Sequence, residues 1–347
     1  MTITSHARKT VCSGTLAFLA VGVLAGAAYG QSLPPRVMVG ASQAGTLQHS
    51  MAAGLARVAT DFSETTLVVQ PFGGATAILP LLNDGELDFG VAPSVDFGLS
   101  YMGPDRLQID GRNPYPDGSG LRLVMAGSPL VATLIVRADS DIRSANDLAG
   151  RRVAGGFPAQ LGAFVNTYAH LVSAGLSWDD VTAVPFTTLN DSLDAVIDGS
   201  IDATVFGVGA PRVREADATV GLRFVSSDCS DEGIARVTAE IPGYFMLDRA
   251  ADSSPAIRDD ICTTGYQMYM VTHADADDTM VRAVLEALWN NLDELPQYHP
   301  SLRAWNAAAA VPDAPTIPFH PAAVTFYQEA GVWEDGMDAV QEQLLAR

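Results

Sequence analysis

A glycine-rich loop near the start of the chain carries residue types suited to binding a small anion. It runs from Gly40 to Thr46, contains Ser42, Gln43 and Gly45, and lies between an apolar stretch and a helical one. Hydroxyl and amide groups donate hydrogen bonds, and glycine lets the backbone come close to a ligand. The first N–H groups of a helix lack intrahelical partners and carry partial positive charge, which favours a carboxylate. The alternative is that Thr46 only caps its helix and the glycines only form the turn.

Three further segments have the same place between a strand and a helix. They are Gly73–Thr76, Gly155–Gln160 and the turn Gly207-Val208-Gly209. Phe157 either encloses a ligand or belongs to the core. The expected ligand contacts are Ser42, Gln43, Gly45, Thr46, Gly73, Gly74, Ala75, Thr76, Ser94, Phe157, Pro158, Gln160, Gly207 and Gly209.

Signatures of catalysis are weak. The glycines at 40 and 45 are one residue too far apart for the Gly-x-Ser-x-Gly turn of a serine nucleophile, and the histidines are isolated, without metal-ligand spacing. We therefore expect no catalytic residue, no metal and no cofactor. The alternative is an exported lyase or hydrolase, for which Asp96 and His49 are the only titratable candidates near the loops.

An internal repeat positions these loops. When residue i is placed against residue i+114 from Val39 to Val91, eleven of 53 pairs are identical, including Pro71-Phe72 with Pro185-Phe186. Composition alone would give roughly three or four identities. The match indicates a duplicated half-structure.

Each copy has the same order of elements. A short strand, a glycine-rich loop, a helix with apolar residues at three- and four-residue spacing, a second strand, a second helix and a third strand follow one another. The expected strands are 37–39, 67–72 and 87–91 in the first copy and 152–154, 181–186 and 201–206 in the second. Two more strand-like runs, 121–125 and 131–136, lie between the copies, and 222–225, 265–272 and the helical stretch 280–295 follow them.

Strands that alternate with helices predict parallel sheets with helices on both faces. Two such units predict two lobes joined by a hinge, with a cleft at the carboxyl ends of the strands. The expected division is residues 31–130 and 265–347 in lobe 1 and residues 131–264 in lobe 2.

The first thirty residues resemble a targeting segment. Arg8 and Lys9 precede an apolar run from Val11 to Ala28, which is typical of a secretory signal peptide. We expect cleavage after Gly30 and a periplasmic location; the alternatives are cleavage near Ala27 and an uncleaved anchor.

Charge and cysteine content fit an exported protein that binds no nucleic acid. The chain has 20 basic and 40 acidic residues and no cluster of cations, which excludes generic nucleic-acid binding. Export leaves Cys229 and Cys262 in an oxidising compartment, where an even pair usually forms a disulfide. That bridge would contribute about 3–4 kcal/mol on the chain-entropy model; the alternative is two separate buried thiols.

The series of motifs resembles the TAXI-type solute receptors of TRAP transporters. In chain order the similar segments are 40–46, 73–75, 85–90, 147–153, 198–203, 209–211, 317–321 and 326–333. Where that family often has Tyr-Tyr after Gly-Thr, this chain has Leu47-Gln48, and Phe157–Gln160 replaces its usual Pro-Gly-Ser-Gly-Thr.

The resemblance implies an α/β, two-lobed periplasmic binding protein type II fold with a central cleft and hinge. It also implies a monomeric, non-enzymatic receptor that delivers a small organic acid, glutamate-like or of the keto- or dicarboxylate type, to the membrane subunits of a TRAP transporter. A binding module that serves a membrane sensor is a further alternative.

Overall fold

The computed structural model describes residues 1–2, 4, 33–103, 113, 115–241 and 244–347. The chain divides into Met1–Ser32 and Leu33–Arg347, and the description below concerns the second part only. The signal peptide expected at residues 1–30 lies almost wholly outside the described residues. No described helix has both the length and the apolar character needed to cross a membrane.

The first α/β unit follows the expected order of elements. It consists of β1 (Arg36–Ala41), α1 (Leu47–Asp61), β2 (Thr66–Pro71), α2 (Ala75–Asn83), β3 (Phe89–Pro93) and α3 (Ser94–Met102). Strand β1 pairs in parallel with both β2 and β3. The apolar positions predicted for the first helix, Leu47, Met51, Leu55 and Val58, are buried, because α1 packs one face against this sheet.

The second α/β unit repeats that order. It consists of β5 (Arg152–Gly156), α4 (Leu161–Ser173), β6 (Thr182–Phe186), α5 (Leu189–Asp198), β7 (Thr204–Gly207) and α6 (Pro211–Val220). Strands β5 and β6 are parallel, and Val153 forms a parallel bridge to Ala203 just before β7. Helices α1 and α4 begin 114 positions apart, as do α2 and α5, so the duplication is confirmed.

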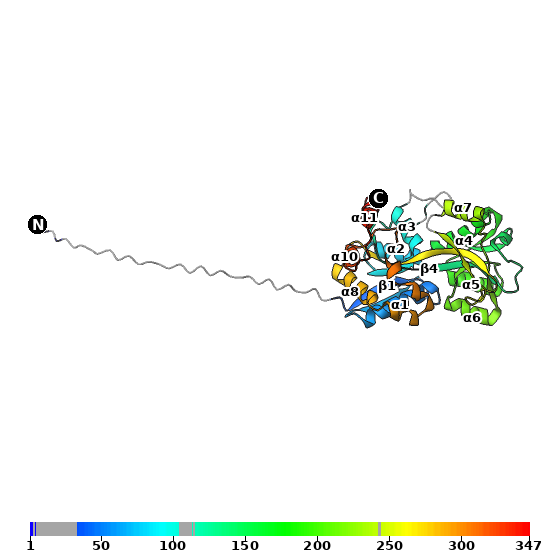
Figure 1. Cartoon of the computed structure of the whole chain (residues 1–347), viewed down its shortest axis with the longest axis horizontal. Coiled ribbons are helices and arrows are strands. Elements are labelled where there is room, and N and C mark those ends of the chain that lie inside the picture. Colours follow the sequence, from blue (N-terminus) through cyan, green and yellow to red (C-terminus); the bar gives the residue numbers. More distant parts are fainter. Residues whose placement is uncertain (3, 5–32, 104–112, 114, 242–243) are drawn as a thin grey trace. The chain divides into compact units, whose positions relative to one another are not determined.

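Two long strands connect the units. The runs expected at 121–125 and 131–136 form one continuous strand, β4 (Leu121–Arg137), which pairs antiparallel with β10 (Ile261–His273). Strand β3 pairs with β10, whereas β7 and β8 (Leu222–Phe224) pair with the second half of β4, and β9 (Phe245–Arg249) pairs with β10. Figure 1 shows β4 between the helices of the first unit and those of the second.

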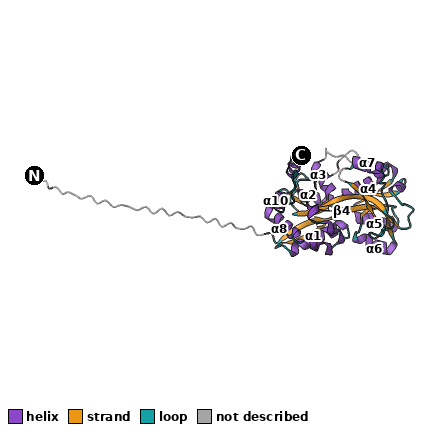
Figure 2. Ribbon diagram, viewed as in Figure 1, coloured by secondary structure: helices purple, strands orange, loops and turns teal. Residues whose placement is uncertain are grey.

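The sheet is therefore mixed rather than purely parallel. The parallel arrangement expected from the sequence holds within each unit, but the shared strands run antiparallel to their neighbours. The period-2 and period-3.6 patterns locate strands, but they carry no information on which strands pair across the repeat. Figure 2 shows helices on both sides of these strands.

The C-terminal segment packs against the first unit. Its elements are α8 (Asp278–Trp289), η3 (Leu292–Gln297), η4 (Pro300–Ala304), α9 (Ala307–Ala310), α10 (Pro321–Glu329) and α11 (Met337–Leu345). Leu123 and Pro318 are joined by a backbone hydrogen bond of 2.8 Å, and the buried Tyr327 hydroxyl donates to the Val124 carbonyl at 2.9 Å. Phe319, Phe326, Tyr327 and the two tryptophans Trp289 and Trp333 form edge-to-face pairs beside these contacts.

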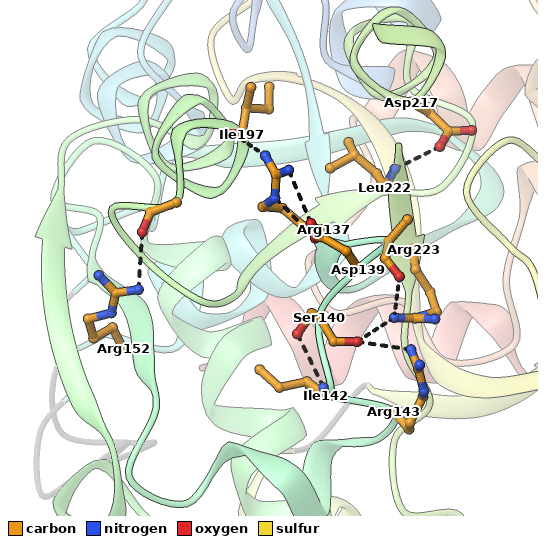
Figure 3. Close-up of polar contacts among 12 residues, drawn as sticks. Arg137, Asp139, Ser140, Ile142, Arg143, Arg152, Ile197, Asp217, Leu222 and Arg223 are labelled. Atoms are coloured by element: carbon orange, nitrogen blue, oxygen red, sulfur yellow. Dashed lines mark hydrogen bonds and ion pairs between the residues drawn. The ribbon is translucent and has the colours of Figure 1, made fainter. Parts of the chain in front are cut away.

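Arginine side chains stabilise the C-terminal end of β4. Arg137 donates to the Ile197 carbonyl at the end of α5 and pairs with Asp139, and Arg223 of β8 donates to the Ser140 carbonyl at 2.8 Å (Figure 3). The remaining short helices here are η1 (Ala145–Leu148), η2 (Trp178–Asp180) and α7 (Asp231–Glu240). A disulfide joins Cys229, before α7, to Cys262 of β10, with Cα atoms 6.2 Å apart.

Candidate ligand-binding site

A small cavity lies where both α/β units meet the two long strands. Its volume is about 20 Å³, which is room for a water molecule or two but not for an organic acid. It is lined by Thr46, Leu47, Gln48, Pro93, Leu130, Ala132, Gln160, Gly162, Ala163, Asn166, Leu189, Val205, Phe206, Gly207 and Tyr266. The first unit, the second unit and both connecting strands therefore all contribute to its wall.

Four helices begin at this cavity. Thr46 is the N-cap of α1 and accepts a hydrogen bond from the His49 backbone N–H at 3.2 Å, and Pro93 precedes α3. Gln160 and Leu189 mark the starts of α4 and α5 in the second unit. Because helix N-termini carry partial positive charge, their convergence makes this region favourable for an anion although no described Lys, Arg or His lines the cavity.

Amide side chains supply the polar groups of the wall. Gln160 of the second unit donates to Gln48 of the first at 3.1 Å, and both side chains are buried. Asn166 donates from Nδ2 to Thr264 at 3.0 Å, while its Oδ1 is buried without a hydrogen-bond partner. Because a buried acceptor without a partner costs free energy, and Oδ1 has none among the described residues, Asn166 is a natural contact for a ligand donor.

A buried carboxyl group lies directly behind the cavity wall. Asp96 of α3 is 1% exposed and accepts a hydrogen bond from the Tyr115 hydroxyl at 2.9 Å. A Cβ atom on Gly162 would lie 2.6 Å from Oδ2 of Asp96, so only glycine lets this carboxyl approach the start of α4. Burial raises the pKa of Asp96 to about 7, although hydrogen bonds from Tyr115 and the Gly162 backbone act in the opposite direction.

The glycine-rich loops of the two units contact each other. The Leu161 backbone N–H donates to the Thr76 hydroxyl at 2.9 Å, and the Arg212 N–H donates to the Gly45 carbonyl at 3.2 Å. A Cβ on Gly74 would lie 2.3 Å from Cβ of Gln160. The glycine-rich loops of the two units therefore face and contact each other.

The fourteen ligand contacts expected from the sequence lie in several different environments. Thr46, Gln160 and Gly207 line the cavity. Gly45, Gly73, Gly74 and Thr76 form the contact between the units, with Ala75 buried at the start of α2. Ser94 is the buried first residue of α3, and its carbonyl accepts from Thr316.

The other five lie away from the cavity wall. Ser42 is buried with an unpartnered hydroxyl, and the Gln43 carbonyl accepts the hydrogen bond of the Thr46 hydroxyl. Phe157 is fully buried at a φ of 51°, which fits the core alternative for its side chain, and Pro158 is exposed. Gly209 lines a different pocket.

Several lining residues were not predicted from the sequence. Gln48 is the second residue of α1, Asn166 lies almost two helical turns beyond its loop, and Tyr266 comes from a strand far along the chain. A signal existed in α4, because Gln160, Ala163 and Asn166 recur every three residues and share one helix face. The glycine at position 162 has no distinguishing feature in the sequence, since its role depends on Asp96.

Comparison with solved structures identifies the fold. The periplasmic binding protein BugD superposes with a TM-score of 0.55 at 12% identity, over 86% of this chain and 99% of that one. MatC (Rpa3494) from Rhodopseudomonas palustris with bound malate superposes with a TM-score of 0.53 at 12% identity, over 89% of this chain and 99% of that one. The expected two-lobed periplasmic binding protein fold is thus confirmed.

A family model covers most of the described chain. It is the model of the NMT1-like family, and it matches residues 39–331. The match begins in β1 and ends just after α10, so it includes both α/β units, both connecting strands and every residue that lines the cavity. The chain therefore belongs to the NMT1-like family.

Proposed function

We propose that this protein is a periplasmic solute receptor that closes its two α/β units around a small organic anion. The observation that carries the proposal is the cavity at the starts of four helices, with walls from both units and from β4 and β10. Its amide and hydroxyl groups orient a ligand, while helix N-termini offset the negative charge. Ligands of glutamate-like or dicarboxylate type match these groups.

Closure of the units provides the mechanism. A cavity of about 20 Å³ has no room for an organic acid, so the units must separate to admit one, and the cavity of the ligand-bound closed form must be wider than it is in this structure. Strands β4 and β10 belong to both units and are the elements about which this movement occurs. A ligand shifts the population toward a closed state only if it binds that state more tightly, which requires contacts with both units. The resulting lobes are residues 31–130 with 265–347, and residues 131–264.

Asp96 makes the proposed closure sensitive to proton concentration. In the closed structure this carboxyl is desolvated beside the start of α4, and its pKa is raised to about 7. When the units separate, water reaches the group and its pKa falls toward the usual range. Protonated Asp96 therefore favours the closed state and adds no negative charge beside an anionic ligand.

The motif series that resembles TAXI-type receptors supports the finer assignment. We propose that the mature protein, released from its signal peptide, acts as a monomer and delivers its ligand to the membrane subunits of a TRAP transporter. Co-purification of the receptor with membrane subunits encoded beside its gene tests this partner. Neighbouring genes for a sensor kinase, with no transporter subunits, would favour the sensor alternative.

A thermal-shift screen over amino acids, keto acids and dicarboxylates tests the receptor function. We expect at least one of them to raise the unfolding temperature, with affinity then measured by titration calorimetry. Thr46→Ala removes a lining hydroxyl that also caps α1, and should weaken binding by about 1–2 kcal/mol, or about 5- to 30-fold.

The matched control is Ser230→Ala. Ser230 caps α7 through its hydroxyl and lies outside the cavity wall, so its loss costs helix stability without removing a ligand contact. Equal affinity losses in both variants would show that capping, rather than contact with the solute, explains the effect of Thr46→Ala.

If the protein is instead an enzyme, the position of Asp96 makes this residue the specific candidate for its catalytic group. A carboxyl group with a pKa near 7 beside a cavity can act as a general acid or base. NMR spectra of each stabilising solute, recorded during prolonged incubation with the protein, separate the two functions. A receptor leaves the spectrum unchanged, whereas an enzyme converts the solute.

A further inference from the structure

A second, larger pocket lies on the opposite side of β4. We call it the rear pocket. Its volume is about 280 Å³, and its polar lining side chains are those of Arg214, Arg249, Ser253, Ser254, His299 and Ser301. Successive side chains of a strand point to opposite faces. Accordingly Leu130 and Ala132 line the cavity described above, whereas Pro129 and Val131 line the rear pocket.

The rear pocket has an unusual charge for this acidic protein. Two arginines and a histidine line it, and no described Asp or Glu does so, although the chain has twice as many acidic as basic residues. Neither Arg214 nor Arg249 forms an ion pair within the described part of the chain. By contrast, Arg137 in Figure 3 pairs with Asp139 and donates to a carbonyl. A terminal nitrogen of Arg223 donates to two backbone carbonyls, although Nε of Arg223 is also buried without a partner among the described residues.

Two buried donors in this pocket are poorly satisfied. Among the described residues, Nε of Arg249 has no hydrogen-bond partner, and Nε2 of His299 has none of good geometry, although the Gly209 backbone lies close enough to act on the His299 pKa. His299 as a residue is only 9% exposed. The other ring nitrogen of His299 accepts the Ser301 backbone N–H at 3.2 Å, which fixes the ring. Burial lowers the pKa of His299, the Gly209 backbone raises it, and the charge of Arg214 lowers it. Unsatisfied buried donors beside two unneutralised cations indicate a missing acceptor.

We propose that the rear pocket is a second binding site, which takes the oxyanion group of a small solute. A carboxylate, phosphate or sulfonate accepts hydrogen bonds from the guanidinium groups of Arg214 and Arg249, from His299, and from the hydroxyls of Ser253 and Ser254. Gly209, which the sequence analysis assigned to the ligand cleft, lies in this site. The site is distinct from the cavity of the proposed function, with which it shares only Leu47.

Titration calorimetry with sulfate, at constant ionic strength and without any other solute, tests this site. We expect saturable binding to the wild-type protein and an affinity at least tenfold lower in both Arg249→Gln and Arg214→Gln. Arg36→Gln is the matched control, because it removes the same charge from an exposed position on β1 that does not line the pocket. Its affinity for sulfate should remain within twofold of wild type.

The pH dependence of sulfate binding provides a second readout. The charged and titratable groups that line the pocket are Arg214, Arg249 and His299, and burial lowers the pKa of His299 from its usual value. Because Nδ1 accepts the Ser301 N–H, the neutral ring donates through Nε2, and charging the ring displaces the Ser301 contact. Sulfate affinity should therefore rise only below the pH at which an exposed imidazole titrates, and His299→Gln should abolish the rise. Ethanesulfonate in place of sulfate distinguishes an organic solute, which would bind more tightly, from an inorganic ion.

Two results would overturn the proposal. One is the absence of saturable sulfate and ethanesulfonate binding to the wild type; the other is unchanged affinity in both arginine variants. If Arg249→Gln fails to fold, Arg214→Gln decides the matter, since Arg214 lies exposed on α6. These measurements do not depend on the thermal-shift screen for solutes. The proposed receptor function and the proposed anion site in the rear pocket are therefore tested independently.

Discussion

Exchange of a single methyl group across the interface tests whether the two units close as described. A Cβ on Gly73 of the first unit would meet only one atom within 4 Å, the Cβ of Ala159 in the second unit, at 2.9 Å. Gly73→Ala therefore introduces one specific overlap. Ala159→Gly removes the opposing methyl, so the double variant carries the same two residue types in exchanged positions.

The size of the effect follows from this distance. Ordinary contact between Cβ atoms begins at about 3.4 Å, so the interface must open by roughly half an ångström or more to accept the extra methyl. Overpacking of this kind costs about 1–2 kcal/mol, which corresponds to about 5- to 30-fold weaker binding of a ligand that requires closure. The cost falls on the closed state alone, because the methyl is free in water when the units separate.

The assay is a double-mutant cycle on the affinity for the solute that gives the largest thermal shift. Gly73→Ala alone should weaken binding, Ala159→Gly alone should change it by less than about threefold, and the double variant should return close to wild type. The expected coupling energy is about 1 kcal/mol or more. Differences in unfolded-chain entropy between glycine and alanine affect folding stability in each variant but cancel in the affinity comparison.

A Gly73→Ala protein that is folded and binds as tightly as wild type would show that the loops do not meet when ligand is bound. A double variant that binds as weakly as Gly73→Ala would show that the methyl acts through some atom other than Ala159.

Two further predictions concern stability and pH. Asp96 binds a proton more tightly in the folded than in the unfolded state, so its own contribution to stability is fully present below about pH 4 and is lost as the pH rises through about 7. Asp96→Asn should remove this contribution and stabilise the protein at pH 8 by up to about 4 kcal/mol relative to wild type, as measured by urea unfolding of both proteins at pH 5 and pH 8. The Cys229–Cys262 disulfide closes a separation of 33 residues, so Cys229→Ser with Cys262→Ser should cost about 3–4 kcal/mol; two free thiols in a non-reducing mass measurement on the wild type would contradict the bond.

The repeat explains why much of the fold was predictable. Apolar residues at three- and four-residue spacing located α1 and α4, and the 114-residue offset predicted that both units would have the same order of elements. The sequence did not reveal that 121–125 and 131–136 belong to one strand. The intervening Gly127-Ser128-Pro129 resembles a turn, but β4 continues through it because Gly127 leaves room for Trp305, whose ring would lie 2.1 Å from a Cβ there.

The site was less predictable because its wall is assembled from distant segments. Thr46 and Gln160 could be found, since glycine-rich loops before helices mark the carboxyl ends of strands. Tyr266 and Asn166 could not, because nothing local indicates which face of β10 or α4 meets the other unit. Asp96 and Gly162 are 66 residues apart in the sequence, and only folding of the chain brings them into contact.

A crystal structure of the protein with the most stabilising solute from the thermal-shift screen tests most directly whether ligand binding holds the two units together. We expect electron density for the solute between the starts of α1 and α4, in contact with Thr46 and Gln160 and thus with both units at once. A solute that touches only one unit, or one that lies outside this cavity with the units unchanged around it, would contradict the claim that ligand binding holds the two halves closed.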